Sequence, residues 1–160
     1  MSMSISFSRK LMFILISFLM GAALLFAPLM KAEASVSWVQ EVTEVAKRYV
    51  GYKFKWGGDS PKTGFDASGY TQYVYKTSAA KIKLPHSSKE QYKLGKSVKK
   101  SELQQGDLVF FNTNGKDVSF VGIYDKDGYF YAATSDGVKR VSLNTKYWKD
   151  RYVGAKRVLK

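Results

Sequence analysis

The fold class predicted from the sequence is α+β, with N-terminal helices packed on an antiparallel sheet of five to six strands. In the first half of the chain, apolar residues recur at the spacing of one helix face. In the second half, short β-prone runs are separated by turn dipeptides. Helices followed by a strand meander are typical of this class, in which the helices cover one face of the sheet.

Three helices are expected in the first half. The first has apolar residues at helical spacing, and Gly51 ends it. These apolar positions are Val39, Val42, Val45, Ala46, Tyr49 and Val50. After a loop over 52–64, rich in glycine, lysine and aromatic residues, a second helix begins with Asp66 as its N-cap. A short third helix is expected from Ser87, because Ser87 and Glu90 have the spacing of a capping box.

The second half contains the β-prone runs of the predicted sheet. They are Asp107–Phe111, Ser119–Tyr124, Tyr129–Thr134, Val138–Ser142 and Tyr152–Val158. The turn dipeptides between them are Asn114-Gly115, Asp127-Gly128 and Asp136-Gly137. Such dipeptides favour hairpins, so neighbouring runs are expected to pair antiparallel.

The N-terminus has the order of features found in secretory signals. Basic residues precede an apolar run over 11–30, and Ala32-Glu33-Ala34 has the A-x-A pattern of a cleavage site. We therefore expect residues 1–34 to be a signal peptide and 35–160 a single domain. The protein would be secreted, extracellular or cell-wall associated, with no stable membrane insertion after cleavage. The apolar run is also long enough for an uncleaved membrane anchor, which is the alternative.

Composition excludes several kinds of site. The chain contains no cysteine and one histidine, so neither a disulfide framework nor a metal site is expected, and no cofactor is predicted. Its formal net charge is +13, which in a cytosolic protein would suggest nucleic acid. Outside the cell the available polyanions are wall polymers and anionic lipid headgroups. No nucleic acid partner is therefore expected, and the scattered lysines indicate a solvated surface with weak attraction to the wall.

Successive segments of the chain resemble the signatures of the NlpC-type cell-wall endopeptidases. The matching segments are YKFKWGG at 52–58, GFDASGY at 64–70, LPHSS at 84–88, LQQGDLVFF at 103–111, VGIY at 121–124, YW at 147–148 and RYVGAKRV at 151–158. They cover nearly all of the expected domain in the family's order. The resemblance implies a papain-like core and a family activity that cuts peptidoglycan stem peptides at D-glutamyl–diamino-acid bonds.

The resemblance also implies where catalytic residues would lie. The family mechanism uses a cysteine at a helix start, a histidine on a neighbouring strand and a third polar residue that orients it. Those positions hold Ala67, Phe120 and Ala132, and Phe54 stands where relatives usually carry a cleft tyrosine. The hairpin turn after Tyr124 would bring Phe120 and Ala132 opposite each other, or nearly so. Because the thiolate carries the chemistry, we predict a natural pseudoenzyme with no catalytic residues.

Function is then expected from the cleft. In the first hypothesis it binds peptidoglycan stem peptides or anionic wall polymers and regulates wall hydrolysis; the candidate contacts are Trp56, Asp66, Ser68, Tyr70 and His86. In the second, the apolar former active site docks a secreted protein partner. A residual hydrolase is the third, although a helical step turns Ser68 by about 100° from the nucleophile position. Alternatively, Phe120 fills and closes the cleft.

Overall fold

The computed structural model describes residues 38–159. The signal peptide expected over 1–34 lies outside the described residues. Within 38–159, none of the helices combines the length and apolar character needed to cross a membrane.

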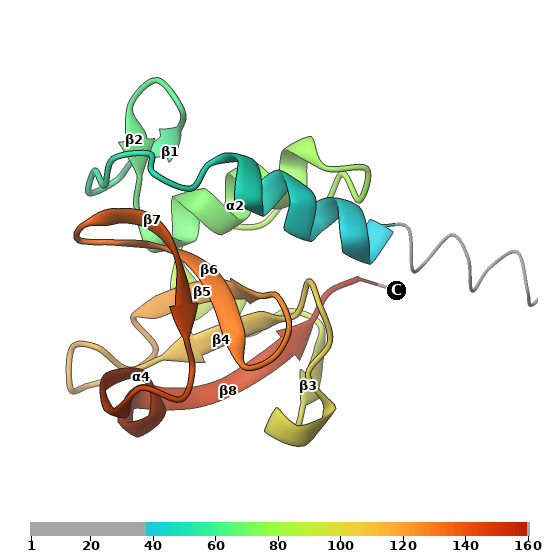
Figure 1. Cartoon of the computed structure of the whole chain (residues 1–160), viewed down its shortest axis with the longest axis vertical. Helices are drawn as coiled ribbons and strands as arrows, with labels where there is room; N and C mark the ends of the chain where they lie inside the picture. The colour runs from blue at the N-terminus through green and yellow to red at the C-terminus, as the bar shows by residue number, and fades with distance from the viewer. Residues whose placement is uncertain (1–37, 160) are drawn as a thin grey trace, which may run out of the picture. The chain divides into compact units, whose positions relative to one another are not determined.

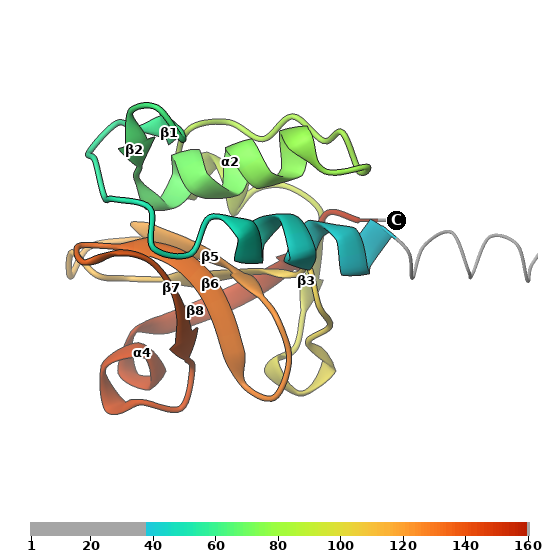
Figure 2. The same ribbon diagram turned by 45° about the horizontal axis from the view of Figure 1, so that its top comes forward.

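Two helices lie together over one face of a sheet, as Figures 1 and 2 show. They are the helix over 38–48 and α2 (Ala67–Thr77). Between them the chain forms a small hairpin from β1 (Asp59–Ser60) and β2 (Gly64–Phe65). A single short turn of helix, α3 (Ser88–Gln91), follows α2.

The second half of the chain builds an antiparallel sheet of six strands in the order β3-β8-β4-β5-β6-β7. The strands are β3 (Lys96–Val98), β4 (Leu108–Phe111), β5 (Phe120–Tyr124), β6 (Tyr129–Thr134), β7 (Gly137–Ser142) and β8 (Tyr152–Arg157). The 3-10 turn η1 (Lys100–Glu102) follows β3, and α4 (Lys146–Arg151) precedes β8. The predicted α+β class is thus confirmed, and so is the antiparallel sheet that follows the helices in the chain.

Local signals in the sequence account for most elements. Asp66 caps α2, its side chain accepting a hydrogen bond from the Gly69 amide, as predicted. Ser87 caps α3 by accepting from the Glu90 amide at 3.3 Å. The returning half of that capping box does not form, because the Glu90 carboxylate binds Lys93 at 2.8 Å instead.

Successive apolar side chains along the strands point to opposite faces of the sheet and so form two separate cores. One core lies between the helices and the sheet, and includes Val42, Tyr70, Val74, Phe110 and Ile123. The other lies on the opposite face and includes Phe111, Phe130, Ala132 and Leu143, with Trp148 of α4 packed against it. Figure 2 shows α4 on the side of the sheet away from the two helices.

Several tyrosines should ionise only at strongly alkaline pH. Burial raises the pKa of Tyr70 and Tyr75 and brings that of Tyr152 to about 12, and the hydrogen bond to Tyr73 raises the pKa of Tyr49 to about 12. Above the usual phenol pKa of about 10, the unfolded chain loses protons that the folded protein keeps. This stabilisation is therefore complete below about pH 10 and lost as the pH rises through 12.

Ultraviolet difference absorbance during an alkaline titration measures this effect. We expect the absorbance change of Tyr49, Tyr70, Tyr75 and Tyr152 to appear only above pH 10, together with the loss of circular dichroism. A single transition near pH 10 with the fold intact would contradict it.

Candidate functional site

A cleft of about 1020 Å³ lies where the start of α2 faces the ends of the central strands. One wall comes from the loop before β1 and from the segment that leads into α3. The other comes from the β4–β5 loop, the β6–β7 turn and α4. Hydroxyl, amide and charged side chains line it together with aromatic rings: Phe54, Trp56, Asp66, Ser68, His86, Ser87, Ser88, Lys89, Thr113, Asn114, Ser119, Phe120, Thr134, Ser135, Asp136, Lys139, Tyr147 and Trp148. The cleft is therefore open, and Phe120 does not close it.

The carboxylate of Asp66 organises one wall of this cleft. Its Oδ1 accepts from the Gly69 amide at 2.7 Å and from Ser68 Oγ at 3.0 Å. Its Oδ2 accepts from the Gly57 amide at 3.0 Å and lies 2.9 Å from His86 Nε2. A single side chain thus joins the start of α2 to the loop before β1 and to the segment before α3.

Glycine at position 69 makes the meeting of these segments possible. A Cβ built on Gly69 would lie 2.1 Å from the carbonyl oxygen of Gly58 and 2.9 Å from His86 Nε2. Real Cβ atoms do not approach backbone that closely, so any larger residue would push the Gly58 loop and His86 away from α2.

The positions that the resemblance assigns to catalysis are placed in two layers. Ala67 and Phe120 both line the cleft, and so does Phe54. Ala132 does not line it; this residue is fully buried in the core on the far face of the sheet, against which Phe120 packs. Ile123 of β5 lies opposite Tyr131 of β6. Extending this register along the two strands sets Ala132 diagonally from Phe120.

The Phe120 ring belongs to an aromatic cluster. Its centroid lies 4.8 Å from that of Trp148 and 6.0 Å from that of Phe111, which in turn stacks on Phe130 at 5.0 Å. These separations are those of favourable aromatic pairs. At position 120 the cleft is therefore lined by hydrocarbon rather than by a proton acceptor.

Four of the five predicted ligand contacts lie in the cleft, and the fifth is wrong. Trp56, with 85% of its surface exposed, stands at the margin beside the Asp66, Ser68 and His86 group. Tyr70 is fully buried and donates to the carbonyl oxygen of Ala46 at 2.7 Å. It lies on the face of α2 that packs on the first helix, so no ligand reaches it.

The hydroxyl of Ser68 does not have the partners of a nucleophile. It donates to Asp66 directly, while His86 binds the other oxygen of the same carboxylate. In a hydrolytic triad the histidine lies between the serine and the acid, and takes the serine proton. The carboxylate of Asp107 offers no alternative, because it is buried outside the cleft and bound to Arg157.

Sequence reasoning missed the far wall of the cleft, including Asn114, Asp136 and Lys139. A signal was present: Asn114-Gly115 and Asp136-Gly137 mark alternate turns of an antiparallel meander, which lie at the same end of a sheet. No cluster of three or more histidine, acidic or cysteine side chains that could hold a metal occurs among residues 38–159.

Comparison with known proteins gives consistent matches. The profile of the NlpC/P60 family matches residues 51–157. The chain is 40% identical over 137 residues to murein DD-endopeptidase MepH of Escherichia coli, covering 80% of this chain and 50% of that protein. It is 41% identical over 132 residues to gamma-DL-glutamyl hydrolase of Bacillus subtilis, covering 79% of this chain and 31% of that one.

The fold also matches solved structures. A crystal structure of an NlpC/P60 family protein from Bacillus cereus superposes with a TM-score of 0.70 at 34% identity, covering 76% of this chain and 40% of that chain. This chain spans half or less of the length of each of these three proteins.

Proposed function

This chain belongs to the NlpC/P60 family, and from that premise we propose that it is a secreted, catalytically inactive member that binds cell-wall stem peptides and so regulates wall hydrolysis. One observation carries the proposal. The cleft is open and keeps its polar walls around a position, Ala67, that has no reactive atom. A site that has lost its chemistry but not its shape is suited to binding.

The absence of catalysis is supported by more than one position. With no cysteine in the chain, no thiolate can attack a peptide bond. Phe120 and Ala132 offer no proton acceptor to any other nucleophile, and Ser68 lacks a histidine as its base. Groups of this kind act as a unit, so their joint loss leaves little covalent catalysis.

Binding of a peptide is supported by the chemistry of the walls. A stem peptide presents amides and carboxylates along an extended backbone, and the rims supply hydroxyl, amide and ammonium groups for them. Trp56 adds a large apolar surface on a loop whose position is fixed by the Gly57–Asp66 hydrogen bond. Little ordering is therefore required when a ligand binds.

A protein partner docked on the former active site has less support. The apolar patch expected from Ala67, Phe120 and Ala132 is smaller than the sequence indicates, because Ala132 is buried and Phe120 is partly covered by the aromatic cluster. What remains is a cleft with polar rims rather than a flat apolar surface.

Trp56→Ala is expected to weaken muropeptide binding about fivefold to tenfold, equivalent to about 1–1.4 kcal/mol. Isothermal titration calorimetry with purified muropeptides measures it. The matched control is Trp38→Ala, since Trp38 is 43% exposed and does not line the cleft. Equal losses in both variants, or no muropeptide binding by the unaltered protein, would refute the proposed ligand. Release of new amine from the muropeptides would refute the loss of catalysis.

A further inference from the structure

Residues 52–65 form a small basic lobe beside the cleft, made of the segment 52–58 and the β1–β2 hairpin. Figure 1 shows this hairpin projecting beyond the ends of the two helices. Lys53, Lys55 and Lys62 are all exposed, and Asp59 is the one acidic residue in the segment. The lobe therefore carries a net positive charge of its own.

The stems of two of these lysines lie side by side. The segment 53–55 runs along β2, with the Lys55 amide donating to Phe65 O at 3.0 Å and the Phe65 amide to Lys53 O at 3.1 Å. A Cβ built on Gly64 would lie 3.1 Å from both Lys53 Cγ and Lys55 Cβ, so both stems start over Gly64. Two residues along an extended chain are about 7 Å apart, which sets the separation of their starting points.

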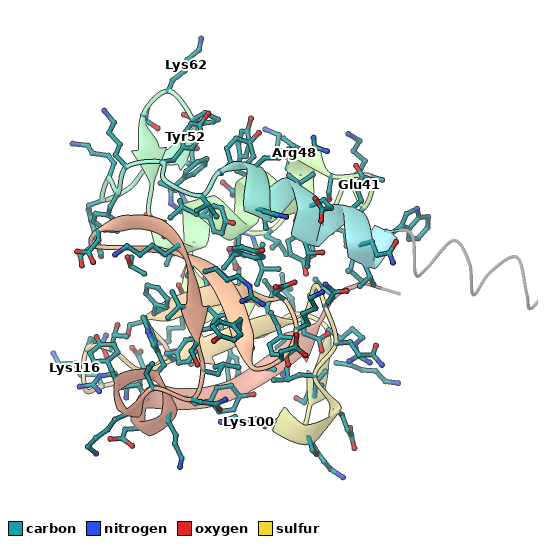
Figure 3. The ribbon with its side chains drawn as sticks, in the orientation of Figure 1. Glu41, Arg48, Tyr52, Lys62, Lys100 and Lys116 are labelled. Carbon is teal, nitrogen blue, oxygen red and sulfur yellow. The ribbon has the colours of Figure 1, made fainter. Side chains whose placement is uncertain are left out.

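The three ammonium groups are available to a ligand. Among residues 38–159, neither an ion pair nor a side-chain hydrogen bond engages Lys53, Lys55 or Lys62. The lysines inside the cleft differ, because Lys89 is bound to Asp117 at 2.7 Å and Lys139 to Asp136 at 2.6 Å. Figure 3 shows Lys62 extending outward from the tip of the hairpin.

The backbone of the lobe is fixed to the rest of the domain. Val138 donates to Tyr52 O at 2.9 Å and Gly51 donates to Val138 O at 2.9 Å, which ties its start to β7. Its end is tied by the Asp66 amide, which donates to Gly58 O at 2.8 Å. The charges are thus held on a preorganised support beside Trp56 and the cleft.

We propose that this lobe is a second binding site, which takes a phosphate-bearing polyanion and holds the cleft close to it. The lobe contains lysines and no arginine. An ammonium group is a point charge that attracts phosphate without demanding a fixed geometry, whereas the arginine fork binds one carboxylate or phosphate group in a fixed bidentate geometry. Lysines on a rigid lobe therefore fit a flexible phosphodiester chain better than one defined carboxylate.

Linear inorganic polyphosphate is the probe, titrated into the purified protein over a series of salt concentrations. The test variant combines Lys53→Gln, Lys55→Gln and Lys62→Gln. If each lysine neutralises a phosphate, the slope of log affinity against log salt falls by about 2, and affinity at low salt falls at least tenfold. The control variant combines Lys76→Gln, Lys96→Gln and Lys126→Gln, which removes the same charge from α2, the β3 edge of the sheet and the β5–β6 turn.

A larger loss in the lobe variant than in the control supports the proposal, provided that both variants keep the circular dichroism and melting temperature of the unaltered protein. Equal losses would overturn it, because net charge alone would then explain the binding. Absence of polyphosphate binding would also overturn it, and binding only to phosphatidylglycerol vesicles would assign the lobe to a membrane surface instead.

The same variants separate this site from the peptide cleft. The lobe variant should keep its muropeptide affinity, and Trp56→Ala should keep its polyphosphate affinity. Failure of muropeptide binding with intact polyphosphate binding would refute the proposed function and leave the lobe standing. Loss of both ligands in the lobe variant would refute the second site as a separate one.

Discussion

The fourfold variant Phe54→Tyr, Ala67→Cys, Phe120→His, Ala132→His is expected to release new amine from muropeptides, whereas Ala67→Cys alone is expected to release none. Ala67 is the first residue of α2, directly after its Asp66 cap, and it faces the same cleft as Phe120. A thiol there lies at a helix N-terminus, which favours the thiolate. It still lacks a base at position 120, and the one histidine of the cleft, His86, is bound to the Asp66 carboxylate.

The expected gain from the added base is about 10²–10⁴-fold in rate. It should appear only when the substitutions at 67 and 120 are combined, because nucleophile and base act as a unit. Muropeptide digestion followed by amine detection and mass spectrometry measures it. Amine released by Ala67→Cys alone would show that a base already exists in the cleft, contrary to the geometry described above.

Packing predicts that the fourth substitution, Ala132→His, must be introduced together with Phe120→His. Ala132 is completely buried in the core against which the Phe120 ring packs. Ala132→His alone is therefore expected to overpack this core, at about 1–3 kcal/mol. With Phe120→His present the penalty should fall, because the smaller ring leaves room. A double-mutant cycle from urea unfolding gives the coupling, and additive effects would contradict it.

The fold could be predicted where local chemistry and tertiary packing agree. Tyr129–Thr134 was predicted with its observed limits, because a continuous β-prone run ends just before the Asp136-Gly137 turn. Strand β3 was not predicted, since Lys96–Val98 has no alternation and exists through its antiparallel pairing with β8. Likewise α4 has no side-chain cap to mark its start, and β1 and β2 are only two residues long.

The site divides in the same way. The capping role of Asp66 is local and was predicted, but its bonds to Gly57 and His86 depend on loops that the fold brings together. Tyr70, in contrast, was predicted to contact a ligand and is buried instead. It lies within one turn of Ala67 on α2, yet the first helix covers it, and its hydroxyl donates a hydrogen bond to the carbonyl oxygen of Ala46. Helical spacing predicts which face of a helix a residue lies on, whereas tertiary packing decides which other element buries that face.

Asp107→Ala is expected to destabilise the protein by about 1–3 kcal/mol, because it removes the buried carboxylate that accepts hydrogen bonds from Arg157 and from the Gln104 amide. Asp107 is 1% exposed and binds Arg157 through two hydrogen bonds of 2.8 Å, from Nε and Nη2, while it also accepts from the Gln104 amide at 2.8 Å. The hydrogen bonds that Arg157 donates to Asp107 raise the pKa of Arg157, so that side chain stays charged throughout.

The loss of stability in Asp107→Ala should reduce muropeptide binding only by unfolding the protein. Asp107 joins β4 to β8, and the preceding Gly106 carbonyl accepts from Tyr75 of α2, so this corner fixes α2 on the sheet. Chemical denaturation measures the stability, and Asp150→Ala, which breaks the exposed Lys146 pair, is the control that should change it little. Below the melting transition the muropeptide affinity of Asp107→Ala should equal that of the unaltered protein. A small loss of stability, or an altered affinity in the folded variant, would contradict this account, because it assigns Asp107 to holding the scaffold and assigns binding to the cleft.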